Sequence, residues 1–337
     1  MFDIYFSTVW RYAPNDAAGE LVLLDWETKK VKSKVSVGPK TVIIDDPNPR
    51  GNSRGGRGIA VVDDKVIAAS YCELQVYDRD LNHLNNITHN LMVGLHEVFY
   101  AGDQKLWLAS TTVDAALLLD LNTGEIIEHF WPCEMPVVQE KWGIQPLGIN
   151  KQADNRLNFL TERLSNHPHH LHFNAITVHQ NEVYGLINRF GAVINLTRQE
   201  IIIENSQLKG CHNLIILEDG TVFINDTRNQ GLFLYNLDGE LIKRIDLLPF
   251  HRARRKVKWY KDTVRLRSFL EKLNLLPQAA AMPFFVRGLD IVGDLAFIGM
   301  SPAAILCVNW RTEELVEQYN YSADTRVAVH GLKVVPR

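Results

Sequence analysis

The sequence is poor in cysteine and has no long apolar run. Its four cysteines, Cys72, Cys133, Cys211 and Cys307, are far apart and form no CxxC pair. This spacing predicts buried, reduced thiols rather than a disulfide framework or a zinc module. No apolar stretch approaches the roughly 20 residues that a membrane-spanning helix needs, and the first ten residues, MFDIYFSTVW, lack the basic and apolar regions of a signal peptide. We therefore expect a cytoplasmic protein that does not enter a membrane.

The sequence also has no excess of charge of either sign. Its net charge is −3 and 22% of its residues are charged, so no global field attracts nucleic acid or an anionic membrane. The glycine-rich stretch GNSRGGRG (51–58) lacks the lysine and hydroxyl of a phosphate-binding loop and the GxGxxG spacing. No Ser/His/Asp or Cys/His motif is recognisable either. We expect no nucleic-acid partner, and local motifs assign no reaction.

The most informative feature is an internal repeat of about 40 residues, with three clear strands and a weaker fourth in each unit. Complete units start at Arg57, His96, Asn174, His212 and Arg287. The last segment, HGLKVVPR from His330, supplies only a first strand, and the N-terminal segments FDIYFSTV and GELVLLDWETKK supply the others. Completing one repeat from both ends of the chain is how β-propellers close their ring. The sequence predicts an all-β, six-bladed propeller in which residues 1–337 form a single domain.

Three segments interrupt the repeat, at about 38–56, 132–168 and 249–285. The second contains DNRLNFLTERL (154–164), whose apolar spacing predicts a short amphipathic helix, and the third contains DTVRLRSFLEKLNLL (262–276), which predicts a longer one. Each segment joins the last strand of one blade to the first strand of the next. Such connections share one face of a propeller with the mouth of the central channel, and long loops on a rigid scaffold usually carry function. We expect the three insertions to cover a pocket there.

A polar residue opens every predicted innermost strand, although these strands are otherwise apolar. In blade order the six positions are His330, Arg57, His96, Asn174, His212 and Arg287. Because the innermost strands start at a common rim, these side chains should meet around the channel mouth. Loops on the same face add Trp10, Arg11, Tyr12, Tyr71, Arg189, Asp226 and Arg228 as candidate ligand-binding residues.

The tract HPHHLHFNAI (167–176) contains four histidines. The alternation of a strand places Asn174, His172 and His170 on one side. We expect His172, and with it His170, to extend toward the channel mouth, and His167 and His169 to lie in an exposed loop. The tract lacks the spacing of a structural zinc module.

Three interpretations of the polar ring remain open. The side chains hold the axis together by hydrogen bonds, or they bind a small anion through Arg57 and Arg287, or His96, His212 and His330 hold a divalent metal with an open position. By alternation Glu97 and Asp290 should point off this face, which favours packing roles for both. The basic segment at 251–267 is a candidate site for a protein partner.

The segments RGIAVV, RGLDIVGDLAFIGMS and HGLKVV resemble units of NHL-like, strictosidine-synthase-like and gluconolactonase-like six-bladed propellers. The block PFFVRGLDIVGDLAFIGMS, with the HFNAI strand, is similar to an uncharacterised family of bacterial propeller proteins of unknown function. The resemblance implies the fold. Gluconolactonase-like enzymes would imply calcium on an axial Glu/Asn/Asp set, and at the matching positions this chain carries His, Arg and Asn174.

From the sequence we predict an axial pocket for a small anionic, carboxylate-bearing molecule or peptide. In an enzyme of lyase, hydrolase or transferase type, His96, His212 and His330 would be the acid/base groups and no cofactor would be needed. Arg57 and Arg287 would clamp the anion, and Asn174 and His172 would orient it. The alternative is a non-catalytic scaffold that uses the insertion face to bind another protein.

Overall fold

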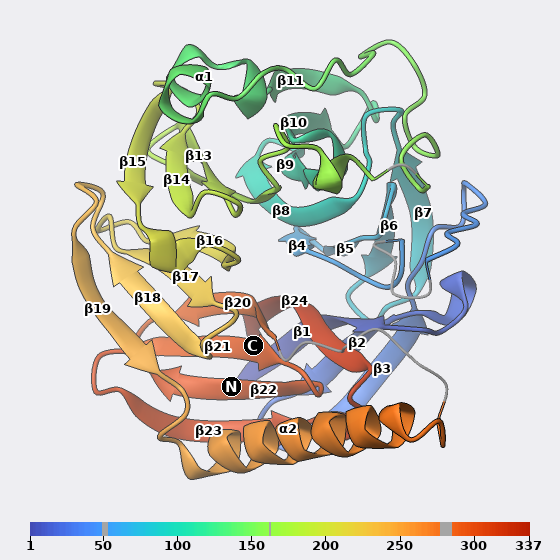
Figure 1. Ribbon diagram of the computed structural model, residues 1–337, viewed down its shortest axis with the longest axis vertical. Coiled ribbons are helices and arrows are strands. Elements are labelled where there is room, and N and C mark those ends of the chain that lie inside the picture. The colour runs from blue at the N-terminus through green and yellow to red at the C-terminus, as the bar shows by residue number, and fades with distance from the viewer. Residues whose placement is uncertain (49–52, 162, 277–284) are drawn as a thin grey trace.

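The computed structural model describes residues 1–48, 53–161, 163–276 and 285–337 of the chain. Parts of all three predicted insertions, including Glu162 within the predicted helix at 154–164, lie outside the described residues. The described residues form six four-stranded antiparallel sheets, which stand in a ring around a central axis (Figure 1). The predicted six-bladed β-propeller is therefore confirmed.

Blades 1 to 3 have the following strands, listed from the axis outward. Blade 1 consists of β24 (Val327–Pro336), β1 (Phe2–Trp10), β2 (Glu20–Asp25) and β3 (Lys30–Ser36). Blade 2 consists of β4 (Ile59–Val62), β5 (Lys65–Ala69), β6 (Glu73–Asp78) and β7 (His83–Thr88). Blade 3 consists of β8 (Leu95–Gly102), β9 (Lys105–Ser110), β10 (Ala115–Asp120) and β11 (Ile126–Phe130).

Blades 4 to 6 follow the same order. Blade 4 consists of β12 (Phe173–His179), β13 (Glu182–Ile187), β14 (Ala192–Asn195) and β15 (Glu200–Glu204). Blade 5 consists of β16 (His212–Ile216), β17 (Val222–Asp226), β18 (Gly231–Tyr235) and β19 (Leu241–Asp246). Blade 6 consists of β20 (Val286–Val292), β21 (Leu295–Met300), β22 (Ala304–Asn309) and β23 (Glu314–Asn320).

The ring closes in blade 1, where strands from both ends of the chain pair. Strand β24 runs antiparallel to β1, with Phe2 opposite Pro336 and Trp10 opposite Val327. The innermost strands β24, β4, β8, β12, β16 and β20 contact one another in turn around the axis. The predicted closure by both termini is confirmed.

The burial of each strand follows its distance from the axis. The middle strands, such as β10 (AALLLD), are buried along most of their length because both of their faces pack against neighbouring blades. Outermost strands such as β3 (KVKSKVS) are polar and largely exposed. The apolar cores therefore lie between blades: one of them joins Tyr5 and Leu23 of blade 1 to Val66 and Ala68 of blade 2.

Irregular strand pairing marks the start of the innermost strands. In β20 the register shifts between Val286 and Leu289, so that Arg287 and Gly288 form a β-bulge, and in β8 the register shifts between Leu95 and Val98. Corresponding shifts occur in β12 and β16, and His330 and Gly331 together face Ser7 of β1. A bulge interrupts the alternation of side chains and re-aims them, and these bulges lie where the polar ring was predicted.

The glycine after a ring residue allows adjacent innermost strands to approach closely. A Cβ atom on Gly331 would lie 2.0 Å from the carbonyl oxygen of Arg57, and one on Gly58 would lie 2.7 Å from the backbone nitrogen of Val98. The backbone nitrogen of Gly58 donates to the carbonyl oxygen of His96 over 2.8 Å. The repeated Arg-Gly and His-Gly pairs therefore serve two purposes, a polar side chain at the rim and a tight contact between blades.

The helices differ from the prediction. Residues 156–161 form turns and bends, Asp154, Asn155 and Arg163 are irregular, and the short 3₁₀ turn η4 (Leu164–Asn166) follows, so the helix predicted at 154–164 is wrong. Phe159 and Leu160 pack against a core that includes Tyr71, and the chain satisfies this packing without a regular helix. The second insertion instead contains α1 (Pro136–Trp142), which follows the 3₁₀ turn η3 (Pro132–Glu134). The other 3₁₀ turns are η1 (Asn15–Ala17), η2 (Thr111–Val113) and η5 (Ser206–Leu208).

The longest helix is α2 (His251–Lys272), which confirms the helix predicted in the third insertion but starts 11 residues before Asp262. Val257 and Tyr260 of α2 are buried in the core shared by blades 5 and 6. The helix therefore lies at the rim beside β23 rather than over the channel (Figure 1). This position differs from the expected cover over the pocket. No helix in the described ranges is long and apolar enough to span a membrane.

Candidate functional site at the channel mouth

Three histidines from distant parts of the sequence meet at the axis. The ring centroid of His96 lies 4.4 Å from that of His330 and 5.1 Å from that of His212. All three side chains are buried, with 7%, 1% and 4% of their surfaces exposed for His96, His330 and His212. The meeting of the ring residues that the repeat predicted is therefore seen in the structure.

The axial hollow is a cavity of about 70 Å³ beside His96, and neither His212 nor His330 is among the described residues that line it. It is lined by Arg57, Gly94, Leu95, His96, Thr111, Thr112, His172 and Arg287. Two of these residues are arginines, and none of the described residues that line the hollow is Asp or Glu. Guanidinium groups present planar pairs of donors that match carboxylate, sulfate or phosphate oxygens.

Hydrogen bonds fix the proton positions on two of the axial histidines. Nη1 of Arg287 lies 3.2 Å from Nε2 of His330; because a guanidinium only donates, Nε2 must accept and the proton of the neutral ring must lie on Nδ1. Nδ1 of His212 lies 3.1 Å from the carbonyl oxygen of Gly210, so it donates and Nε2 carries the lone pair. Among the described residues, neither Nδ1 of His330 nor Nε2 of His212 has a hydrogen-bond partner. The axial cluster thus contains one buried donor and one buried acceptor without a partner among the described residues.

Burial lowers the basicity of the axial groups. Desolvation is the largest cause that holds the pKa values of His96, His212 and His330 well below their usual range, and nearby arginines lower them further. Desolvation also lowers the pKa of His172 to about 3. Desolvation and, to a smaller extent, the charge of Arg11 lower the pKa of Arg57 to about 9. At neutral pH the four imidazoles are therefore neutral, and the positive charge of the hollow resides on the arginines.

Glu97 pairs between blades, as expected for a packing role, but its carboxyl also lies beside the axial histidines, which the alternation argument did not predict. Nδ2 of Asn213 donates to Oε1 of Glu97 over 2.7 Å, and Oδ1 of Asn213 accepts from the backbone nitrogen of Gly288 and from Nδ2 of Asn225. Burial raises the pKa of Glu97 to about 8, while the charge of Arg287 opposes this rise. Asp290 does pair between blades as expected, since it accepts from the backbone nitrogen of Val334 and from Nζ of Lys333. The network through Asn213 connects blades 3, 5 and 6.

The alternative hypothesis is that His96, His212 and His330 hold a divalent metal, and the positions of their ring nitrogens bear on it. Among the described residues, the ligand atoms of His96, Glu97 and His330 lie within 4.8 Å of one another, and this group contains Glu97 in place of the predicted His212. A metal on Nδ1 of His330 would require the proton to move to Nε2, which already faces the Nη1 donor of Arg287. A metal bound at this group would therefore compete with Arg287 for the ring of His330.

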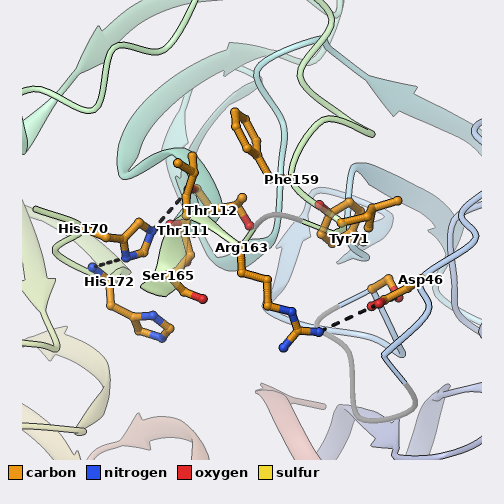
Figure 2. A pocket seen from close by; sticks show the side chains of 12 residues that line it. Asp46, Tyr71, Thr111, Thr112, Phe159, Arg163, Ser165, His170 and His172 are labelled. Atoms are coloured by element: carbon orange, nitrogen blue, oxygen red, sulfur yellow. Dashed lines mark hydrogen bonds and ion pairs between the residues drawn. The ribbon is translucent and has the colours of Figure 1, made fainter. Parts of the chain in front are cut away.

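A second cavity, which we call the insertion hollow, lies beside the axial one and is lined from two of the insertions (Figure 2). Asp46 and Ser53 come from the first insertion, Phe159 and Arg163 come from the second, and the buried Tyr71 comes from the loop between β5 and β6. The guanidinium of Arg163 reaches a carboxylate oxygen of Asp46 over 3.9 Å and so joins the two insertions. This hollow shares Thr111, Thr112 and His172 with the axial hollow.

A third cavity, which we call the basic hollow, is open to solvent and has a volume of about 320 Å³. It is lined by Ser165, His170, His172, Asn188, Arg189, Lys209, Gly210 and Arg228. His172 lines all three hollows, and its backbone has a left-handed φ of 57° just before β12 begins. The predicted candidates His172, Tyr71, Arg189 and Arg228 are thus brought to the same face.

Other predicted residues lie away from these hollows. Asn174 is fully buried and donates to the carbonyl oxygen of Cys211. Asp226 is buried in an ion pair with Arg244. Nε2 of His170 lies 3.0 Å from the carbonyl oxygen of Thr111 and lines the insertion and basic hollows instead of the axial one. His167 is exposed and His169 half-buried.

The three residues at the end of β1 lie near the rim. The guanidinium of Arg11 stacks on the ring of Phe285, and that of Arg287 lies 4.3 Å from the centre of the same ring. Trp10 packs against the core between blades 1 and 6, with the guanidinium of Arg326 over its ring. Tyr12 is half-buried and has a left-handed φ of 66°. The four cysteines are buried, free thiols.

Comparison with known proteins establishes the fold but no family. No protein-family model matches the sequence, and no curated protein is similar to it. Among solved structures, a protein of unknown function from Bacteroides caccae superposes with a TM-score of 0.60 and 10% sequence identity, over 100% of this chain and 99% of that one. A chain of a nidogen/laminin complex superposes with a TM-score of 0.57 and 7% identity, over 99% and 98% of the two chains. Structural neighbours thus support the six-bladed propeller fold alone.

Proposed function

We propose that the axial hollow binds a small anionic molecule, with Arg57 and Arg287 as its principal donors. The observation that carries this proposal is the lining of the hollow, which contains two buried or half-buried guanidinium groups and none of the described Asp or Glu residues. The nearby carboxyl of Glu97 does not neutralise them at pH 7, because burial raises its pKa to about 8. Two like charges beside one small cavity repel each other in a medium of low dielectric constant. A bound carboxylate would relieve this repulsion and accept hydrogen bonds from both arginines.

We further propose that the site performs acid/base chemistry on the bound anion. Nε2 of His212 is a buried, neutral acceptor, and Nδ1 of His330 is a buried donor. Such a pair can take a proton from a substrate at Nε2 of His212 and donate a hydrogen bond from Nδ1 of His330 to a substrate oxygen on which negative charge develops. His96 lies between the two other rings, and His172 lies at the junction of the three hollows.

Ligand binding can be tested by calorimetry and thermal unfolding. We expect acetate, butyrate, sulfate or phosphate to raise the Tm of the wild-type protein, because a ligand that binds only the native state stabilises it by mass action. The Arg287→Gln variant should lose this rise, whereas Arg198→Gln, a change of the same charge on the opposite face, should keep it. The proposal would be overturned if none of the four anions raised the Tm, or if the Arg287→Gln variant responded like the wild type.

The catalytic part and the metal alternative need separate measurements. His212→Gln should bind the same anion with little change in Kd but lose turnover of any carboxylate that the wild type converts. Elemental analysis of the purified protein tests the alternative in which the axial histidines hold a divalent metal. A stoichiometric metal that is lost in His96→Ala would replace the metal-free proposal.

A second candidate function is the docking of a protein partner on α2. The helix exposes Trp259, Leu266 and Phe269, with 46%, 60% and 57% of their surfaces accessible, beside the basic residues Arg254 and Arg255. Large exposed apolar residues within a polar rim are typical of protein interfaces. A Leu266→Glu/Phe269→Glu variant should lose a partner that the wild type and Arg287→Gln both retain in a pull-down. Retention by all three proteins would count against this site.

A further inference from the structure

The basic hollow has the chemistry of a second anion subsite next to the proposed axial one. Arg189, Lys209 and Arg228 line it, together with the amide of Asn188, and none of the described lining residues is Asp or Glu. The whole chain has a net charge of −3, so this positive charge is a local feature of the channel mouth. A concave surface lined by one sign of charge concentrates ligands of the opposite sign.

Packing and hydrogen bonds hold the polar groups of the basic hollow in place. Nη1 of Arg189 donates to the carbonyl oxygens of His167 and His170 over 2.7 and 3.0 Å. The side chain of Arg228 lies over Gly210, where a Cβ atom would come within 2.4 Å of Nε of Arg228. Any residue larger than glycine at position 210 would displace this guanidinium, so the close approach defines where Arg228 lies.

The two subsites are adjacent. His172 lines both the axial and the basic hollow, and the carbonyl oxygen of Gly210 accepts the Nδ1 hydrogen of the axial His212. A ligand bound to Arg57 and Arg287 can therefore extend past His172 toward Arg228. A ligand could instead extend into the insertion hollow. There, however, the charged residues Asp46 and Arg163 are paired with each other, so of the two hollows the basic one is the better match for a second negative group of the ligand.

We infer that the ligand is an elongated dianion, with one anionic group in the axial hollow and the other in the basic hollow against Lys209 and Arg228. This inference rests on the proposed function of the axial site and names the class of its ligand, a dicarboxylate or a molecule with two comparable acidic groups. A single small anion would occupy the axial hollow and leave the second cluster of positive charge uncompensated.

The test compares straight-chain dicarboxylates from succinate to suberate with monocarboxylates of the same chain length, using calorimetry at low salt. We expect one dicarboxylate length to bind at least about tenfold more tightly than its monocarboxylate, because both charge clusters are then satisfied. Lys209→Gln/Arg228→Gln should reduce this dicarboxylate to the affinity of the monocarboxylate without changing the latter. Both residues are exposed, so we expect the variant to fold.

Two further proteins serve as controls. Lys30→Gln/Arg198→Gln removes the same charge from the opposite face, at the start of β3 and in the turn between β14 and β15, and it should keep the full dicarboxylate preference. Lys209→Arg/Arg228→Lys preserves the positive charge of the basic hollow and should keep most of the dicarboxylate preference.

The possible failures are distinct. If monocarboxylates bind in an Arg287-dependent manner but no dicarboxylate binds better, the second subsite does not exist and the axial proposal survives. An equal loss of dicarboxylate affinity in both double glutamine variants would show a global charge effect and would also overturn the subsite. If neither class of acid binds, the proposed function itself fails.

Discussion

Asn213 of blade 5 donates a hydrogen bond to Glu97 of blade 3 over 2.7 Å, although blade 4 lies between these two blades in the ring. The same amide accepts from the backbone of Gly288 in blade 6. The centre of the ring is therefore held together by a polar network as well as by apolar packing between blades. Partners buried in such a network are costly to remove, since each group left behind keeps its desolvation penalty.

Asn213→Gly should destabilise the protein by about 2–4 kcal/mol, because Glu97, Asn225 and the nitrogen of Gly288 would each lose a partner. Glycine tolerates the left-handed φ of 60° at this position, so backbone strain does not contribute. Chemical denaturation measures the change. Asn181→Gly, at an exposed turn with a φ of 64°, is the matched control, and an equal effect of both changes would refute the role of the network.

Glu97 should make the protein less stable as the pH rises. Its pKa is about 8 in the folded state and near 4.5 in the unfolded chain, so between these values the folded state holds a proton that the unfolded state has lost. Stability contributed by this group is therefore complete below pH 4.5 and falls as the pH increases toward 8, by up to about 1.4 kcal/mol per pH unit. Glu97→Gln should flatten this part of the stability profile. An unchanged slope would show that Glu97 ionises normally.

His172 should have the opposite effect at acid pH. Its pKa falls from 6.5 to about 3 on folding, so the unfolded chain takes up a proton below pH 6.5 that the folded protein does not bind. The free energy of unfolding should therefore decrease as the pH falls from 6.5 toward 3. His172→Asn, which suits the left-handed backbone, should reduce the slope by up to about 1.4 kcal/mol per pH unit. Urea unfolding at pH 5, 6 and 7 gives the comparison, and parallel profiles would contradict the shift.

Gly331→Ala should be among the most damaging small changes in the chain. The new methyl group would lie 2.0 Å from the carbonyl oxygen of Arg57, and relieving the clash would separate blades 1 and 2. We expect a loss of about 3 kcal/mol or more. Gly143→Asn, in the open space after α1 at a φ of 64°, should cost far less. Thermal unfolding of the two variants distinguishes the close approach from a general effect of replacing glycine.

Much of this arrangement could be predicted from the sequence because a propeller repeats one supersecondary unit. The recurring polar residue before an apolar strand located His96, His212, His330, Arg57 and Arg287 at the axis. The roles of Glu97 and Asn213 could not be predicted in this way, since simple alternation places them away from the ring. The bulges that turn them inward depend on contacts between innermost strands that are distant in sequence.

The insertions show a different limit. Apolar residues at helical spacing in 154–164 predicted a helix, but Phe159 and Leu160 satisfy their burial as part of an irregular segment above Tyr71. The helix in 251–272 formed, yet its position at the rim depended on an apolar surface offered by blades 5 and 6. Periodicity indicates that a segment has an apolar side. It does not indicate where that side will pack, because the matching apolar surface exists only in the folded ring.

The pairing of β24 with β1 has a consequence for biosynthesis. A ribosome releases β1 first and Val327–Pro336 more than 300 residues later, so the first blade lacks its innermost strand during nearly all of translation. His330 belongs to that strand, so the hydrogen bond from Arg287 to its imidazole can form only after the strand has been synthesised. In a nascent or prematurely terminated chain, blade 1 therefore lacks its innermost strand and the axial cluster lacks His330. Chaperones or proteases can recognise such an incomplete ring.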